Sequence, residues 1–208
     1  MTLLSGAAPN LHDVRTTAIL VVDTQQDFCA GGALAVPGGE AVVPVLNRVL
    51  AVAAERGLTC YATRDWHPAD SHHFQPRGPW PVHCVAGTAG ARFHPDLRRP
   101  TDTVIVNKGT LVDSDGYSAF DGYLDDGNGT TLVADDLARR GVTHLVIGGL
   151  ATDYCVRASV LDALRRGFEV TVMADAIAAV EQRVGDGPRA IEEMRSAGAT
   201  LATSAIIT

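Results

Sequence analysis

The sequence has few cysteines, no excess of basic residues and no long apolar run. Four cysteines among 208 residues are too few for a disulfide scaffold, so each is packing filler, a metal ligand or a reactive thiol. Acidic residues outnumber basic ones by 24 to 17, and the net charge of −7 argues against nucleic acid as a partner. The most apolar stretch, residues 145–151, is far too short to span a membrane. Because the first residues also lack the basic and apolar regions of a signal peptide, we expect a cytoplasmic protein.

What the chain does contain is an alternation of short apolar runs with helical patterns. Runs rich in β-branched residues predict strands at 18–22, 59–63, 103–107, 144–148 and 169–173, with a weaker sixth at 200–203. Apolar residues repeat at helical spacing within 42–53, 156–164 and 188–197, and a further helix is expected just before the fourth strand. This pattern predicts an α/β fold with three layers, α/β/α, doubly wound around a mainly parallel six-stranded sheet. We expect an N-terminal tail at 1–17 and a single domain at 18–208.

Residues 64–100 form an unusually long loop between the second and third predicted strands. They carry six of the ten prolines, five of the seven histidines and both tryptophans. Loops of this length inside a compact domain are usually functional or disordered, and the tryptophans argue against disorder. Asp65, His67, His73 and His83 suit a divalent ion such as zinc, iron or manganese. A histidine-rich loop can equally be a polar surface, so the spacing alone leaves both interpretations open.

Three chemically capable side chains follow three different predicted strands. Asp23 follows the first strand, Lys108 the third, and Cys155 stands at a helix start after the fourth. Taken singly, they can be a turn residue, a solvated charge and a buried small hydrophobe. In open α/β sheets, however, ligands bind beyond the carboxyl ends of the strands, where these residues converge. A helix start lowers a thiol pKa, so the set predicts acyl transfer through a cysteine nucleophile.

Six fragments of the sequence, in order, carry a resemblance to a known family. They are VVDTQQDFCAGGALAVPGG at 21–39, TRDWHPADSHHF at 63–74, WPVHCVAGTAGARFHPDL at 80–97, VNKG at 106–109, YSAF at 117–120 and GLATDYCVRAS at 149–159. Together they resemble the nicotinamidases, a family within the isochorismatase-like cysteine hydrolases.

The resemblance implies a role for each part of the site. Its catalytic triad corresponds to Asp23, Lys108 and Cys155, and its metal ligands to Asp65, His67 and His83. Around His73 the sequence departs from the commoner family pattern, which leaves this residue either an added ligand or a solvated loop residue. The oxyanion hole corresponds to the backbone amides of Ala151 and Cys155, with a cis peptide bond between Leu150 and Ala151. The side chains that would line the ring pocket are Phe28, Trp80 and Tyr117.

The implied activity is the metal-dependent hydrolysis of nicotinamide to nicotinate and ammonia, through a thioester on Cys155, in NAD salvage. It requires one divalent metal ion per chain and a small-molecule amide as substrate, with neither nucleic acid nor membrane as a partner. Two alternatives stay open: a hydrolase of another small or heteroaromatic primary amide, and a non-catalytic member that only binds ligand. The sequence also leaves open whether the chain forms a homo-oligomer.

Overall fold

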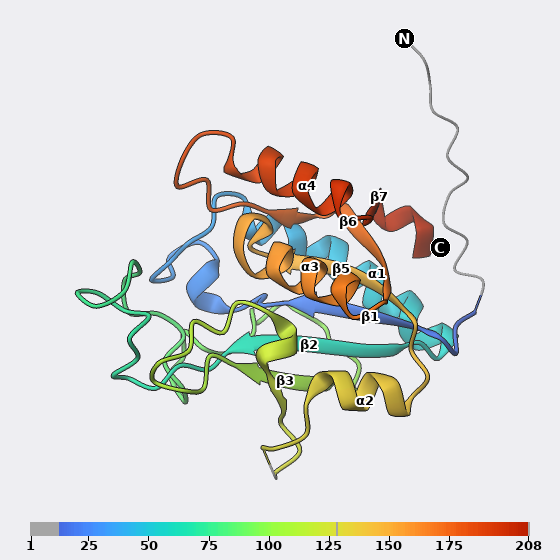
Figure 1. Ribbon diagram of the computed structural model, residues 1–208, viewed down its shortest axis with the longest axis horizontal. Coiled ribbons are helices and arrows are strands. Elements are labelled where there is room, and N and C mark those ends of the chain that lie inside the picture. The colour runs from blue at the N-terminus through green and yellow to red at the C-terminus, as the bar shows by residue number, and fades with distance from the viewer. Residues whose placement is uncertain (1–12, 128, 208) are drawn as a thin grey trace.

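One sheet runs through the middle of the computed structural model, which describes residues 13–127 and 129–207 (Figure 1). Its seven strands lie in the order β4-β3-β2-β1-β5-β6-β7. In chain order the strands are β1 (Thr17–Val22), β2 (Thr59–Asp65), β3 (Val104–Lys108), β4 (Tyr123–Leu124), β5 (His144–Leu150), β6 (Glu169–Ala178) and β7 (Thr200–Ala202). The α-helices are α1 (Val42–Arg56), α2 (Val133–Arg139), α3 (Arg157–Arg165) and α4 (Asp186–Ser196).

The sheet confirms the predicted α/β class and contains one strand more than the six expected. All six expected strands pair in parallel, whereas β4 pairs antiparallel to β3 at the sheet edge. The prediction of six strands missed β4 because two residues are too short to show an alternation. Strand β6 also extends to Ala178, beyond the expected end at Met173, because exposed Ala174 and Asp175 interrupt the apolar run without ending the strand.

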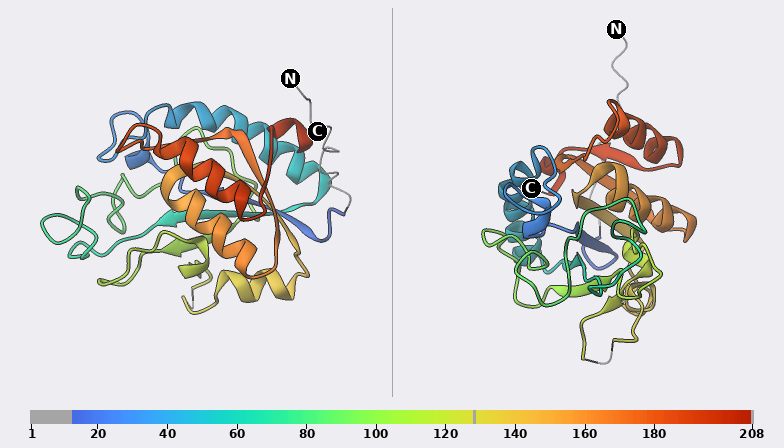
Figure 2. Two further views of the ribbon diagram at one scale, coloured as in Figure 1. Left: turned by 45° about the horizontal axis from the view of Figure 1, so that its top comes forward. Right: turned by 90° about the vertical axis from the view of Figure 1, so that its left-hand side faces the viewer.

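Helices cover both faces of this sheet and produce two separate cores (Figure 2). On one face α1 packs through Leu46, Val49 and Leu50 against residues of β1, β2 and β5. The other face is covered by α2, α3 and α4. The central strand β1 is buried along its whole length, because β2 and β5 flank it and both of its faces are covered. A strand buried on both faces explains the continuous apolar run TAILVV.

The long segment between β2 and β3 begins beyond the carboxyl end of the sheet and then returns along α1 to the start of β3. Residues 66–103 contain neither an α-helix nor a strand of the sheet. In Figure 1 the first part of this segment forms the turquoise and green loops past the tips of the strand arrows. These tips are the carboxyl ends of the parallel strands, so this first part lies where the candidate side chains converge.

The described residues begin within the predicted tail. Residues 1–12 lie outside them, and Thr17 already belongs to β1. Among the residues that the structure describes, no helix is both long and apolar enough to cross a membrane.

Candidate active site

Asp23, Lys108 and Cys155 meet in the interior, at the carboxyl ends of three strands. Asp23 follows β1, Lys108 is the last residue of β3, and Cys155 lies in a π-helical turn, Thr152–Val156, between β5 and α3. The Lys108 Nζ atom lies 2.8 Å from Asp23 Oδ2 and 3.4 Å from Cys155 Sγ. All three side chains are buried. The structure therefore brings together the three residues that the sequence analysis placed at separate strand ends.

Burial and the neighbouring charges set the protonation of this cluster. Burial raises the pKa of Asp23 to about 6, with Lys108 opposing and Asp65 adding to the increase. For Lys108, burial alone would lower the pKa, but the carboxylates of Asp23 and Asp65 outweigh it and the pKa is raised. Burial also raises the pKa of the Cys155 thiol well above its usual value, although Lys108 opposes the increase. The predicted lowering of the thiol pKa is therefore wrong for this site, because burial, together with the carboxylates of Asp23 and Asp65, outweighs the effect of Lys108, and the neutral thiol requires a base.

Asp23 is placed to be that base. Its carboxylate oxygen, one from Asp65 and the Cys155 sulfur lie within 4.8 Å of one another. The Thr63 hydroxyl donates to Asp23 Oδ1 at 2.6 Å and fixes the carboxylate. Asp23 also has a positive φ of 43°, a conformation that aspartate tolerates better than most residues. Sequence reasoning missed Thr63, because nothing local to β2 shows that its hydroxyl faces the end of β1.

The candidate oxyanion hole and the ring pocket adjoin the sulfur. Ala151 and Cys155 line one cavity together with Phe28, Trp80 and Tyr117. The Leu150–Ala151 peptide bond is cis, as the resemblance implied. The Trp80 indole N–H donates to the Tyr117 hydroxyl at 2.9 Å, which fixes the two rings relative to each other.

Three further side chains, Leu34, Tyr154 and Val180, line this cavity and were not predicted. Leu34 and Tyr154 fall inside the sequence fragments that carry the resemblance, so a signal was present for them, whereas Val180 lies outside all six. The Tyr154 ring packs edge-on against Trp80, with centroids 4.8 Å apart.

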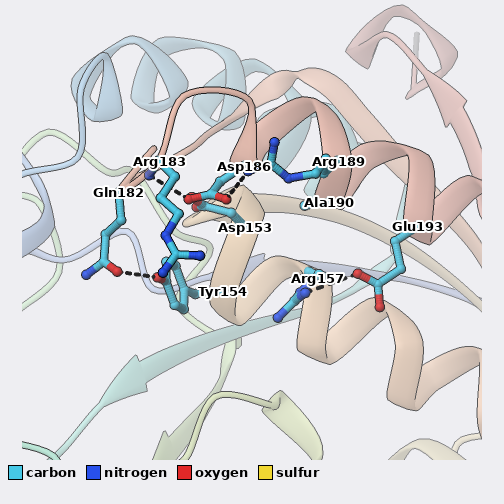
Figure 3. A pocket seen from close by; sticks show the side chains of 9 residues that line it. All are labelled: Asp153, Tyr154, Arg157, Gln182, Arg183, Asp186, Arg189, Ala190 and Glu193. Carbon is cyan, nitrogen blue, oxygen red and sulfur yellow. Dashed lines mark hydrogen bonds and ion pairs between the residues drawn. The ribbon is translucent and has the colours of Figure 1, made fainter. Parts of the chain in front are cut away.

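Tyr154 also lines a second pocket, of about 350 Å³, formed by the π-helical turn, the start of α3, the loop before α4 and α4 itself (Figure 3). Its hydroxyl donates to Gln182 Oε1 at 3.0 Å, and Arg157 pairs with Glu193 at 3.0 Å. Two ion pairs, Arg157 with Glu193 and Arg189 with Asp186, lie on its wall, and no cysteine, serine or lysine is among the residues that line it.

The loop histidines form a buried cluster, and two of them, His73 and His83, line the same cavity. His67, His73 and His83 each offer a ring nitrogen within 4.8 Å of the others, so the structure brings His73 into the set. Asp65 Oδ2 lies 3.6 Å from His67 Nε2, and the other Asp65 oxygen accepts from Lys108. Asp65 therefore touches both the histidine cluster and the triad.

The ring nitrogens of this cluster are arranged as a metal site requires. Each Nδ1 faces an oxygen that can only accept: Gly109 O at 3.0 Å from His67, Asp115 Oδ1 at 3.0 Å from His73 and Pro81 O at 2.8 Å from His83. Each neutral ring thus keeps its Nε2 lone pair free. His67 Nε2 is buried and has no hydrogen-bond partner in the described part of the chain. Burial lowers the pKa of His83 to about 4, which favours the neutral, ligating form. These donors fit a first-row divalent ion.

The remaining cysteines are buried, and all four thiols are free. Burial raises the pKa of Cys29 and of Cys60 to about 11 and that of Cys84 well above its usual value. Unlike Cys155, none of these three is among the residues that line the candidate cavity, so we interpret them as packing groups.

The comparisons with known proteins agree with this geometry. The family model described as the isochorismatase domain matches residues 17–206, and the chain belongs to this family. The nicotinamidase of Escherichia coli is 41% identical over 205 residues, covering 90% of this chain and 95% of that protein.

Two solved structures extend this similarity to the fold. The pyrazinamidase of Pyrococcus horikoshii, solved in complex with zinc, superposes with a TM-score of 0.82 at 43% identity, covering 90% of this chain and 99% of that one. The protein described as PnC1 from L. infantum, solved in complex with nicotinate, also has a TM-score of 0.82, at 34% identity, covering 93% of this chain and 96% of that one. The family resemblance carried by the six sequence fragments is thereby confirmed.

Proposed function

We propose that this protein is a metal-dependent cysteine amidohydrolase that converts nicotinamide to nicotinate and ammonia. The observation that carries the proposal is one cavity lined both by Cys155 and by His73 and His83 of the histidine cluster. The similarity to the E. coli nicotinamidase and to a structure containing nicotinate supports this choice of substrate. A flat pyridine suits the aromatic walls of Phe28 and Trp80.

The first half of the reaction forms a thioester. Asp23 removes the proton from the Cys155 thiol, and the sulfur attacks the carboxamide carbon. The backbone N–H groups of Ala151 and Cys155 hold the resulting oxyanion. When the intermediate collapses, the C–N bond breaks, Asp23 returns its proton to the departing nitrogen, and ammonia leaves. Lys108, 2.8 Å from Asp23 and 3.4 Å from the sulfur, favours the ionised forms of both.

The second half hydrolyses the thioester. A water molecule gives a proton to Asp23, and its oxygen attacks the thioester carbon. The C–S bond breaks, the sulfur of Cys155 recovers the proton from Asp23, and the nicotinic acid loses its carboxyl proton to solvent to give nicotinate. The pKa of Asp23, raised to about 6 by burial, suits a group that must take and release a proton near neutral pH.

The ligands that would hold a divalent ion are Asp65, His67, His73 and His83. When bound, the ion supplies a Lewis acid for the pyridine nitrogen and so orients the carboxamide toward the cysteine. We expect about one equivalent of zinc, iron or manganese per chain on elemental analysis. The zinc in the P. horikoshii structure favours zinc among the three. We further propose a role in NAD salvage, in the cytoplasm, for a single domain at residues 18–208.

Ammonia release from nicotinamide tests the proposal. The Cys155→Ala variant should lose more than about 1,000-fold in kcat, because no other group can form the thioester. Cys60→Ala is the matched control, since Cys60 is a buried thiol within β2, away from the cavity. Full turnover in Cys155→Ala would refute the nucleophile assignment.

A second substrate is favoured by a particular finding. The relative from Mycobacterium tuberculosis, 40% identical over 191 residues, is a nicotinamidase/pyrazinamidase. Pyrazinamide and nicotinamide have rings of the same size, so both should be hydrolysed. A panel of primary amides that includes pyrazinamide and one aliphatic amide decides how far the pocket selects for a heteroaromatic ring.

A further inference from the structure

The segment that follows β3, residues 109–117, packs against the histidine loop. Gly109 O accepts from His67 Nδ1 at 3.0 Å, and Val112 O accepts from the His72 backbone N–H at 2.7 Å. Three residues further along, the Asp115 carboxylate accepts from His73 Nδ1 at 3.0 Å. This segment offers no ligand of its own to the cluster. It does accept the Nδ1 hydrogen bonds of two of the three ligating histidines, His67 and His73.

Asp115 differs from the other groups that accept hydrogen bonds from the Nδ1 atoms of the histidine cluster. The rings of His67 and His83 are held by backbone carbonyls, of Gly109 and Pro81, whereas His73 is held by a charged side chain. The Asp115 side chain is 66% exposed, while that of His73 is only 3% exposed. A carboxylate behind a histidine fixes its tautomer and makes the opposite nitrogen a stronger ligand than a carbonyl does.

We propose that Asp115 is a positioning residue of the metal site, which orients the His73 ring and strengthens its bond to the metal. The inference rests on the metal site of the proposed function. A hydrogen bond to a carboxylate as exposed as that of Asp115 contributes little to the stability of the fold. Its main effect should therefore be on metal binding, and this separates a positioning role from a merely structural one.

The chain offers a matched control two residues away. Asp113 is an exposed carboxylate on the same segment, and it forms no hydrogen bond or ion pair in the described structure. Replacing Asp113 or Asp115 changes the net charge equally, but only the second change removes the acceptor from His73. Asp115→Asn is the conservative variant, because its amide oxygen still accepts from Nδ1 but carries no charge.

The test measures the zinc dissociation constant by competition with a chelator in the purified, full-length protein. Asp115→Ala should weaken zinc binding by about 10- to 100-fold, and Asp115→Asn should recover part of that loss. Asp113→Ala should stay within about twofold of wild type, since it touches no ligand. Cobalt(II) bound in place of zinc gives a visible spectrum that reports the ligand set, and it should change in Asp115→Ala but not in Asp113→Ala.

Two outcomes overturn the inference, and they are distinguishable. If wild type and Asp115→Ala bind zinc equally and share one cobalt spectrum, Asp115 positions nothing, while the proposed metal site stands. If wild-type protein binds neither zinc nor cobalt, the metal part of the proposed function fails together with this inference. Nicotinamide turnover by that metal-free protein would still leave the cysteine chemistry supported.

Discussion

Gly109, directly after Lys108, lies against the ring of one ligating histidine, His67. It has a φ of 63°, and a Cβ atom there would lie 2.3 Å from His67 Cε1. Gly109→Ala should therefore displace the His67 ring and abolish stoichiometric zinc binding, as measured by elemental analysis. It should also lower the free energy of unfolding by more than the roughly 1–2 kcal/mol that a left-handed alanine costs.

Gly57 supplies the control for this prediction. It has a similar φ of 71° at the end of α1, but a Cβ atom there would meet nothing within 4 Å. Gly57→Ala should cost about 1 kcal/mol of unfolding free energy through backbone strain alone and leave zinc content unchanged. Wild-type zinc content in Gly109→Ala would show that the His67 ring is not held by this contact.

At the scale of elements, a buried polar contact fastens α2 to the sheet. The Tyr61 hydroxyl in β2 donates to Asp136 Oδ2 in α2 at 2.6 Å, and both side chains are fully buried. Tyr61→Phe should lower the free energy of unfolding by about 1–3 kcal/mol, because it leaves a carboxylate oxygen short of a donor. Urea denaturation measures this loss. Tyr123→Phe in β4 should be nearly neutral, since the Tyr123 hydroxyl has no hydrogen bond in the described ranges; an equal loss there would contradict the assignment.

The same carboxylate predicts a pH dependence of stability. Burial alone would raise the pKa of Asp136, but the hydrogen bonds from Tyr61 and Arg140 outweigh it, so the pKa is lowered. A carboxyl group with a lowered pKa stabilises the fold above its unfolded pKa of about 3.9, and that contribution disappears as the pH falls through the lower folded value. Asp136→Asn should therefore destabilise the protein at pH 7, and the gap to wild type should shrink below about pH 4. Urea denaturation at both pH values checks this, and a gap independent of pH would contradict it.

For the molecule as a whole, the histidine cluster should link metal binding to stability. A ligand that binds only the folded state raises the unfolding free energy by RT ln(1 + [L]/Kd), about 2.7 kcal/mol at 100 times Kd. Zinc at 100 times Kd should raise the melting temperature of wild-type protein whose metal has been removed with a chelator. The melting temperature of His67→Ala should stay unchanged. Differential scanning fluorimetry measures both, and an equal shift in the two proteins would place the zinc elsewhere.

What the sequence predicted well depends on local pattern and on one topological rule. The apolar runs mark β1, β2, β3, β5 and β6, and the meeting of parallel strand ends places Asp23, Lys108 and Cys155 together. Contacts between segments distant in sequence were not predictable. These are the hydrogen bonds of Thr63 with Asp23, of Asp115 with His73 and of Tyr61 with Asp136 in α2. The prediction of a lowered pKa for the Cys155 thiol was wrong for a related reason. A sequence reveals a helix start but not how completely the fold desolvates the sulfur.

Asp65 contacts two parts of the site that come from different segments of the chain. The triad stands on strand ends, whereas His67, His73 and His83 belong to the long segment after β2. Altering that segment alone would change which molecules are held before the sulfur while the acylating machinery stays in place. Grafting the corresponding loop from a relative with another substrate is therefore a direct route to redesigned specificity on this scaffold, provided that Asp65 keeps its contact with Lys108.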